Sequence, residues 1–216
     1  AELLRDPGLS NTERSNYLDI LSRNGESLSI IINDILDLSK VEAGHLSLEY
    51  TDIYPKHISE DVISLLRVKA KEKDLALEFK CEVSDDDSIV ADGNRVRQIL
   101  LNIVGNAIKF TRFGTVKLHL YQTKSKLGQN TLCFEVADTG IGIPHSQRDN
   151  IFDMFVQADG TMTRRFGGTG LGLALSKKLT LNMGGDVSIL KTKENIGTTF
   201  LIEILDQPAK KASQST

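Results

Sequence analysis

The sequence predicts an α+β fold, in which a two-layer α/β sandwich, a mixed sheet packed on helices, follows one long helix. Apolar residues between positions 17 and 38 recur at alternating steps of three and four, the spacing of a helical seam. From Asp52 onward, helical periodicity is mixed with runs of alternating apolar and polar residues. The chain has 216 residues, 40% of them hydrophobic, which is enough for one ordinary domain and a smaller helical element.

The first expected element is a long helix over residues 11–42. Its seam consists of Tyr17, Leu21, Leu28, Ile31, Ile35 and Leu38, with Asn24 at the one polar step. Ser10 and Glu13 have capping-box spacing before the helix, and Gly44 follows its last apolar position. Such a seam must be covered, either by a second copy of the helix or by the rest of a larger globular core. We predict the dimer.

The second part of the chain mixes further helices with strands. We expect helices near 55–72, 93–111 and 170–183, and strands near 75–83, 115–123, 131–137, 186–192 and 198–205. Residues 124–130 form a polar connection that contains glycine, so the strands on either side should form a hairpin. Residues 145–169 lack regular periodicity and are rich in polar residues and glycine, which is typical of a functional loop, and we interpret them as a mobile lid.

Composition narrows the classes of partner. The formal net charge is -3, with Lys and Arg spread along the chain, so we expect no contact with nucleic acid or with an anionic membrane. No apolar run approaches the roughly 20 residues of a membrane span, and no signal peptide is recognisable. Cys81 and Cys133 lie in predicted strands, where buried unpaired thiols are expected. These features favour a cytoplasmic chain, whose longer parent could be membrane-anchored.

The predicted helix over 93–111 carries two stripes of side chains. Its apolar stripe is structural and consists of Val96, Ile99, Leu100, Ile103, Val104, Ala107 and Ile108. The second stripe contains Asn102, Asn106 and Lys109, although asparagine is a poor residue for a helix interior. Amide oxygens suit Mg²⁺, and a lysine can balance phosphate charge. The stripe therefore indicates a nucleotide-phosphate site, with a solvated polar face as the alternative.

A glycine-containing turn follows the predicted strand over 131–137. It reads Asp138-Thr139-Gly140-Ile141-Gly142-Ile143. A carboxylate at a strand end can accept a hydrogen bond from an exocyclic amine such as that of adenine, and glycines let the backbone approach a flat ring. Taken alone, the pattern also fits a turn with two positive-φ glycines or the active-site triplet of an aspartic protease.

A second glycine-rich segment, Gly167 to Gly172, leads into an amphipathic helix. Its backbone N–H groups and the helix N-terminus can face an anion. No Gly-Lys pair occurs in the chain, and the glycine spacing is not that of a dinucleotide fold. The motifs of a phosphate-loop NTPase, a Rossmann enzyme and a protein-kinase catalytic loop are therefore absent.

The motifs together, in their order, closely resemble the catalytic core of sensor histidine kinases, in the superfamily that also contains gyrase, chaperone and MutL ATPases. They are Asn102-x3-Asn106-x2-Lys109-Phe110, Asp138-Thr139-Gly140-Ile141-Gly142, Ile151-Phe152-Asp153-Met154-Phe155, Gly168-Thr169-Gly170-Leu171-Gly172 and Gly197-Thr198-Thr199-Phe200. The segment from Ile35 to Gly44 also looks like the end of the second dimerisation helix of that family. The resemblance thus covers essentially the whole chain.

The resemblance implies a role for each motif residue. Asn102 and Asn106 would contact Mg²⁺ and phosphates, Lys109 would bind phosphate, Phe110 would flank the nucleotide, and Asp138 would receive the adenine amino group. The remaining ATP-binding residues would shape the pocket and lid: Gly140, Gly142, Ile143, Arg165, Gly168, Thr169, Gly170, Leu171, Gly172 and Thr199, the last beside Asp138. Phe152 and Phe155 would pack the lid. Gln157 stands where many relatives place a phosphate-directed arginine, a task that Arg164 or Arg165 could take.

The resemblance also implies an activity and a division of the chain. Residues 1–46 would be part of a dimerisation and phosphoacceptor hairpin, 47–206 the ATP-binding catalytic domain, and 207–216 a polar linker. The parent would be a homodimeric transferase that uses ATP and Mg²⁺ to phosphorylate its own histidine and then an aspartate of a response-regulator receiver domain, as in a phosphorelay. No histidine here has the acceptor's sequence neighbourhood, so we expect the acceptor upstream. Alternatives are a nucleotide-sensing interaction module and another ATPase of the same superfamily.

Overall fold

The computed structural model describes residues 9–124, 128–154 and 170–207. The chain divides into two compact units, Ala1–His45 and Leu46–Thr216.

The first unit contains the single helix α1, Asn11–Glu42. Its capping box is present: the Glu13 N–H donates to Ser10 Oγ at 3.2 Å, and the Ser10 N–H donates to the Glu13 carboxylate at 3.0 Å. Gly44 follows with φ +68, a left-handed conformation that favours glycine. The predicted helix and both of its ends are confirmed. No described helix is long and apolar enough to cross a membrane.

The second unit contains the remaining elements. They are β1 (Thr51–Ile53), α2 (Pro55–Lys71), β2 (Ala76–Cys81), β3 (Ile89–Ala91), α3 (Gly93–Phe110), β4 (Thr115–Lys124), β5 (Asn130–Asp138), the 3-10 turn η2 (His145–Gln147), α5 (Gly172–Asn182), β6 (Asp186–Lys193) and β7 (Gly197–Leu205). Every predicted helix and strand is present, with ends within three residues of the expected ones. The prediction missed β1, β3 and η2, because three residues are too few to show a period.

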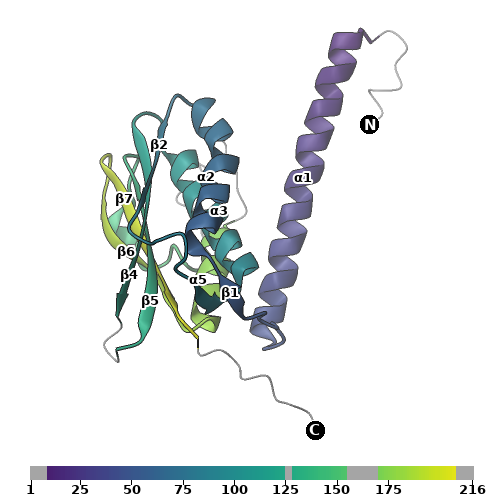
Figure 1. The fold of residues 1–216 in the computed structure, drawn as a ribbon. Coiled ribbons are helices and arrows are strands. Elements are labelled where there is room, and N and C mark those ends of the chain that lie inside the picture. The colour runs from purple at the N-terminus through teal and green to yellow at the C-terminus, as the bar shows by residue number, and fades with distance from the viewer. Residues whose placement is uncertain (1–8, 125–127, 155–169, 208–216) are drawn as a thin grey trace. The chain divides into compact units, whose positions relative to one another are not determined.

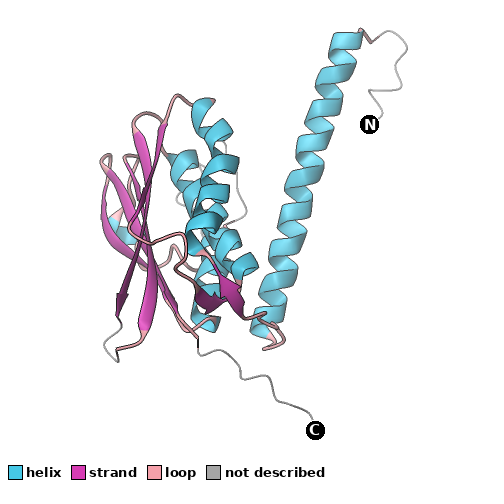
Figure 2. Cartoon of the chain, viewed as in Figure 1, coloured by secondary structure: helices cyan, strands magenta, loops and turns pink. Residues whose placement is uncertain are grey.

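The main sheet has five strands in the order β2-β4-β5-β7-β6. Strands β2 and β4 are parallel and the other neighbouring pairs are antiparallel, so the sheet is mixed, as predicted. The expected hairpin is confirmed, with β4 and β5 paired from Val116 and Asp138 to Lys124 and Asn130. Helices α2, α3 and α5 cover one face of this sheet, which gives the two-layer sandwich (Figures 1 and 2).

The core lies between the helices and this face of the sheet. Alternate residues of β4 and β5 point into it, and each of the following is fully buried: Val116, Leu118, Leu120, Leu132, Phe134 and Val136. The whole predicted apolar stripe of α3 is also buried. Each such side chain contributes about 1.5–3 kcal/mol of burial free energy, so the core fixes the rotation of α3 about its axis. That rotation decides where the second stripe of α3 lies.

The two cysteines are unpaired, as predicted. Cys133 is buried, and burial raises the pKa of its thiol to about 11, so it stays protonated at neutral pH. The prediction that both thiols are buried was wrong for Cys81. This residue is only partly buried, because it is the last residue of the short edge strand β2.

Candidate functional site

Asp138 is the last residue of β5, and its carboxylate is held by main-chain groups. The Gly140 N–H donates to Oδ1 at 2.8 Å and the Thr198 N–H donates to the same oxygen at 3.3 Å. No residue in the described part of the chain bonds to Oδ2. Asp138 can therefore accept a further hydrogen bond in a fixed direction.

Burial raises the pKa of Asp138 above its ordinary value, and the hydrogen bonds from Gly140 and Thr198 lower it in part. Desolvation strengthens any hydrogen bond that this carboxylate accepts. A partly buried carboxylate with one oxygen available is suited to recognising a donor, such as an exocyclic amine.

Two glycines beside Asp138 are required by close backbone contacts. Gly142 has φ +69, and a Cβ on it would lie 2.1 Å from the Lys193 carbonyl oxygen. Gly197 has φ +134, and its Cβ would lie 1.9 Å from the Asp138 carbonyl oxygen. No L side chain fits at either position without moving the backbone. The turn therefore packs tightly against the β6–β7 connection.

Thr198, and not the predicted Thr199, lies against Asp138. Thr199 pairs with Ala137 across β5 and β7, so its side chain shares the face of Ala137, opposite to that of Asp138. The prediction was one residue out of register, which in a strand places a side chain on the wrong face. Thr198 also bonds through its hydroxyl to the hydroxyl of Thr192 at 3.0 Å.

Ile143 is held at the far end of the same turn. Its N–H donates to Oγ1 of Thr192 at 2.9 Å. Thr192 therefore links the turn to Thr198, the residue that contacts Asp138.

The second stripe of α3 forms a short chain of amides. Asn106 Nδ2 donates to Asn102 Oδ1 at 3.3 Å, and Asn102 Nδ2 donates to Ser176 Oγ of α5 at 2.8 Å. Oδ1 of Asn106 has no partner among the described residues. Both asparagines are partly buried, so they are not part of a fully solvated polar face.

Gly172, the first residue of α5, lies against the amide of Asn102. A Cβ on Gly172 would be 2.4 Å from Asn102 Oδ1 and 2.7 Å from Nδ2. Asn102 can occupy this place only because residue 172 has no side chain. Leu171 before it is buried, and Gly170 has φ +70.

Lys109 and Phe110 follow on the last turn of α3. The Lys109 ammonium lies 4.8 Å from the centre of the Phe110 ring and has no ion-pair partner among the described residues. Burial lowers the pKa of Lys109, and the charge of Lys73 lowers it further. Lys73 itself donates to the carbonyl oxygens of Ile108 and Lys109, at 2.8 and 2.7 Å, and so caps the C-terminus of the helix.

The turn after Asp138 and the second stripe of α3 meet at the C-terminal end of α3. The Ile141 N–H donates to the Phe110 carbonyl oxygen at 3.4 Å, and a Cβ on Gly140 would lie 2.6 Å from that oxygen. The glycine turn after Asp138 therefore packs directly on the helix end that carries Lys109. The predicted residues Arg165, Gly168 and Thr169 lie outside the described residues, as do most of the predicted lid and the alternative phosphate ligand Arg164.

Comparison with known proteins identifies the family. Residues 91–208, more than half of the chain, match the family model described as histidine kinase-, DNA gyrase B- and HSP90-like ATPase. The chain belongs to this family. Residues 1–44 match the His Kinase A (phospho-acceptor) domain, and together the two matches make the chain the catalytic core of a sensor histidine kinase.

The relatives of this histidine kinase core are longer proteins. It is 38% identical over 196 residues to the signal transduction histidine-protein kinase BarA of Escherichia coli K12, covering 91% of this chain and 21% of BarA. The structure resembles full-length ShkA in complex with AMPPNP, with a TM-score of 0.76, 33% identity, and coverage of 96% of this chain and 42% of ShkA. It also resembles the histidine kinase ThkA in complex with the response regulator TrrA, with a TM-score of 0.66, 25% identity, and coverage of 95% and 54%. The chain thus spans about a fifth of BarA.

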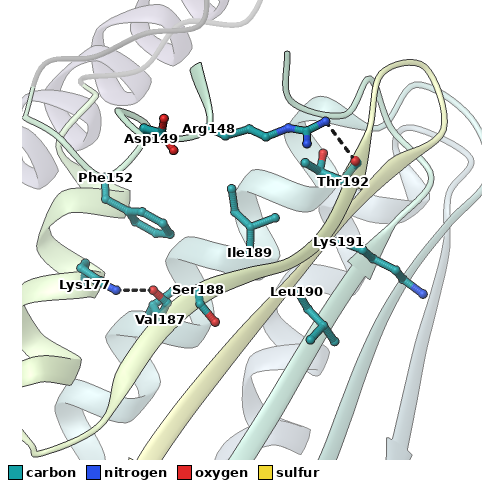
Figure 3. A pocket seen from close by; sticks show the side chains of 10 residues that line it. All are labelled: Arg148, Asp149, Phe152, Lys177, Val187, Ser188, Ile189, Leu190, Lys191 and Thr192. Atoms are coloured by element: carbon teal, nitrogen blue, oxygen red, sulfur yellow. Dashed lines mark hydrogen bonds between the residues drawn. The ribbon is translucent and has the colours of Figure 1, made fainter. Parts of the chain in front are cut away.

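The kinase core has a hollow of about 370 Å³ elsewhere, between the segment after η2, helix α5 and strand β6 (Figure 3). Arg148 donates to the Thr192 carbonyl at 3.3 Å and Lys177 donates to the Val187 carbonyl at 2.7 Å, so both cations cover main-chain oxygens of the edge strand β6. The Lys177 ammonium also lies over the face of the Phe152 ring, 5.2 Å from the ring centre. None of the predicted ATP-site residues that the structure describes lines this hollow, and we assign it no nucleotide.

The donor set of the kinase core fits Mg²⁺ and ATP. Two amide oxygens on adjacent turns of α3 are hard neutral ligands that suit Mg²⁺ when phosphates and waters supply the rest. Because Gly172 has no Cβ, the amide of Asn102 has room against α5. Lys109, half-buried with no carboxylate partner among the described residues, leaves a cation available to phosphate.

Sequence reasoning missed three residues of this site: Lys73, Ser176 and Thr198. Lys73, in the turn after α2, and Ser176, in α5, act on α3 from outside that helix, and spacing within one helix cannot reveal such a contact. The only sequence signal for Ser176 is a polar residue one turn after Gly172 on the buried side of α5.

Proposed function

We propose that this chain binds ATP with Mg²⁺ between Asp138 and the second stripe of α3, as the ATP-binding half of a protein-histidine kinase. The adenine amino group donates to Asp138 Oδ2. The phosphates lie toward Asn102, Asn106 and Lys109, and Phe110 flanks the nucleotide. Gly140, Gly142 and Ile143 form the adenine side, and Arg165 with Gly168 to Gly172 the lid side.

One observation carries this proposal: the turn after Asp138 packs on the end of α3 that carries Lys109. A partly buried acceptor for an amine thereby lies next to the helix end that carries a half-buried ammonium, which has no ion-pair partner among the described residues. The structural likeness to ShkA, solved with AMPPNP, supports a nucleotide at this place.

The reaction that we propose is transfer of the ATP γ-phosphoryl group to a histidine. Such transfer needs little covalent chemistry from the protein and depends on positioning and charge neutralisation. Asn102 and Asn106 would hold Mg²⁺, which would supply positive charge beside the phosphates. Lys109 stabilises phosphate charge from the protein side.

The acceptor that we propose is a histidine outside residues 1–216. The segment that matches the phospho-acceptor domain, residues 1–44, contains no histidine. His45 lies after the end of α1, and His57 lies in α2, His119 in β4 and His145 in η2, elements of the ATP-binding unit. This chain therefore supplies the nucleotide, and a neighbouring helix supplies the acceptor.

We propose two protein partners: a second copy, through α1, and a response-regulator receiver domain. Leu21, Leu28 and Ile35 of the α1 seam are 41%, 58% and 43% exposed, and apolar side chains at this spacing favour helix pairing. The solved complex of ThkA with TrrA supports the second partner. Two unpaired cysteines support a cytoplasmic location.

Label transfer from γ-labelled ATP tests the kinase proposal. The chain is extended at its N-terminus with the adjoining parent sequence that contains the acceptor histidine, and a variant with that histidine replaced by glutamine is the control. We expect label on the extended chain and none on the control. Nucleotide binding without label on the extended chain would support the nucleotide-sensing module instead.

A further inference from the structure

We infer that Ser176 is a positioning residue for the Mg²⁺ ligands of this site, because it accepts the last hydrogen bond of the amide chain through Asn106 and Asn102. The inference rests on the ATP-Mg site proposed above and adds a residue of α5 that does not itself contact the nucleotide.

An asparagine amide has two chemically opposite ends. Its oxygen can ligate a cation, whereas its NH₂ group only donates hydrogen bonds, so a rotation of about 180° about χ2 turns a ligand into a repelling group. Asn102 and Asn106 can therefore serve a cation only if their amides are held in one of two orientations. Nothing within α3 itself fixes that choice.

The observed hydrogen bonds run in one direction. Asn106 Nδ2 donates to Asn102 Oδ1 and Asn102 Nδ2 donates to Ser176 Oγ, at 3.3 and 2.8 Å. Because the chain of hydrogen bonds runs from Asn106 through Asn102 to α5, Oδ1 of Asn106 lies at its open end, without a described partner. The second lone pair of Asn102 Oδ1 remains for a cation. An acceptor at Ser176 is what terminates the chain in this direction.

Ser176 is itself buried. Its side chain is 1% exposed, and its carbonyl oxygen accepts a hydrogen bond from Thr180 Oγ1 at 2.8 Å. Gly172, one turn before Ser176 in α5, also packs against the amide of Asn102. A Cβ on Gly172 would lie 2.4 Å from Asn102 Oδ1. The Asn102 amide thus lies between Gly172 and Ser176. Substitution of a supporting group of this kind weakens metal binding, although the group touches no metal.

The experiment compares AMPPNP binding to the 216-residue chain in Mg²⁺ and in EDTA, by calorimetry. The Mg²⁺-dependent tightening is the ratio of the two dissociation constants. We expect Ser176→Ala to reduce this ratio by about three- to tenfold, the effect of one net hydrogen bond, and to leave the affinity in EDTA unchanged. Ser176→Cys, which keeps the volume but offers only a weak sulfur acceptor, should behave like Ser176→Ala. Ser176→Thr, which keeps the hydroxyl, should restore the ratio.

A double-mutant cycle separates positioning from a structural role. In an Asn102→Ala background, Ser176→Ala should cause no further loss of tightening, because it acts through Asn102. The matched control is Ser59→Ala, which removes another fully buried helix hydroxyl, bonded to the Pro55 carbonyl in α2, and should leave the tightening unchanged.

Two results overturn the inference. In the first, Ser176→Ala and Ser176→Cys both show the same Mg²⁺-dependent tightening as wild type. In the second, Ser176→Ala reduces the tightening as much in the Asn102→Ala background as it does in wild type. A wild-type chain whose AMPPNP affinity does not respond to Mg²⁺ would instead refute the proposed metal site. The two failures are thereby distinguishable.

Discussion

The side-chain oxygens of Asp138 and Asn102 are held in place by different kinds of group. Asp138 receives two main-chain N–H groups and lies against glycines whose neighbours are carbonyl groups. Asn102 is held by the side chains of Asn106 and Ser176, from two helices. The adenine end of the proposed site is thus built from backbone and the phosphate end from side chains.

This difference predicts how each end responds to substitution. A backbone contact cannot adjust without moving strands, so changes at the glycine turn should be large and should affect the fold. A side-chain network can be altered one group at a time, so changes along α3 and α5 should be graded and should affect mainly the ligand.

Gly197→Ala should lower the free energy of unfolding by at least about 1–3 kcal/mol, because a Cβ there meets the Asp138 carbonyl at 1.9 Å in a left-handed backbone conformation. Urea denaturation measures this change. The matched control is Gly105→Ala inside α3, where a Cβ meets nothing within 4 Å. The control should raise the stability by about 0.5–1 kcal/mol. Equal stability of Gly197→Ala and wild type would show that the turn is not held by the backbone.

Asp138→Asn should weaken ATP binding by roughly 10- to 100-fold, since it loses a charge-assisted hydrogen bond and turns an NH₂ group toward the adenine amine. In the absence of ligand, the same substitution should instead raise the free energy of unfolding at neutral pH. Burial raises the folded pKa of Asp138 above its unfolded value, so folding favours the protonated form. The stability from this group is present below the unfolded pKa and lost as pH rises through the folded pKa.

The stability of Asp138→Asn relative to wild type should therefore increase from acid to neutral pH. Urea denaturation of both chains across this range checks the sign. A constant difference would mean that the carboxylate is not buried as described.

Lys109→Met should weaken ATP binding by about tenfold and adenosine binding hardly at all, because the ammonium acts on phosphate. Burial and Lys73 lower the pKa of Lys109, so the wild-type preference for ATP over adenosine should also decline as pH rises into the alkaline range. Titration with both ligands at two pH values measures both effects. Equal losses for ATP and adenosine would place Lys109 away from the phosphates.

Lys73→Met should have the smallest effect, about 1 kcal/mol of stability, through loss of the hydrogen bonds that cap α3. Thermal unfolding and ATP titration should show a lower melting temperature with affinity changed less than twofold. A large affinity loss at unchanged stability would make Lys73 a ligand-contacting residue.

The sequence was sufficient for features that repeat over many residues. The seam of α1 and the apolar stripe of α3 predicted both helices, and the rotation of α3 followed from the stripe. Strands β1 and β3 were missed because three residues carry no usable period. Thr199 was chosen in place of Thr198 because a motif does not fix strand register to one residue. Ser176 could not be found from sequence, since its partner Asn102 lies 74 residues away on another helix.

Base selectivity tests the adenine end of the proposed site most directly. Calorimetry with ATP and with ITP, which carries an oxygen in place of the adenine amino group, compares a donor and an acceptor opposite residue 138. We predict that wild type binds ATP about tenfold or more tightly than ITP, and that Asp138→Asn, whose NH₂ group can donate to the inosine oxygen, abolishes or reverses this preference. An ATP-to-ITP ratio that is the same in both chains would contradict the assignment of Asp138 to adenine.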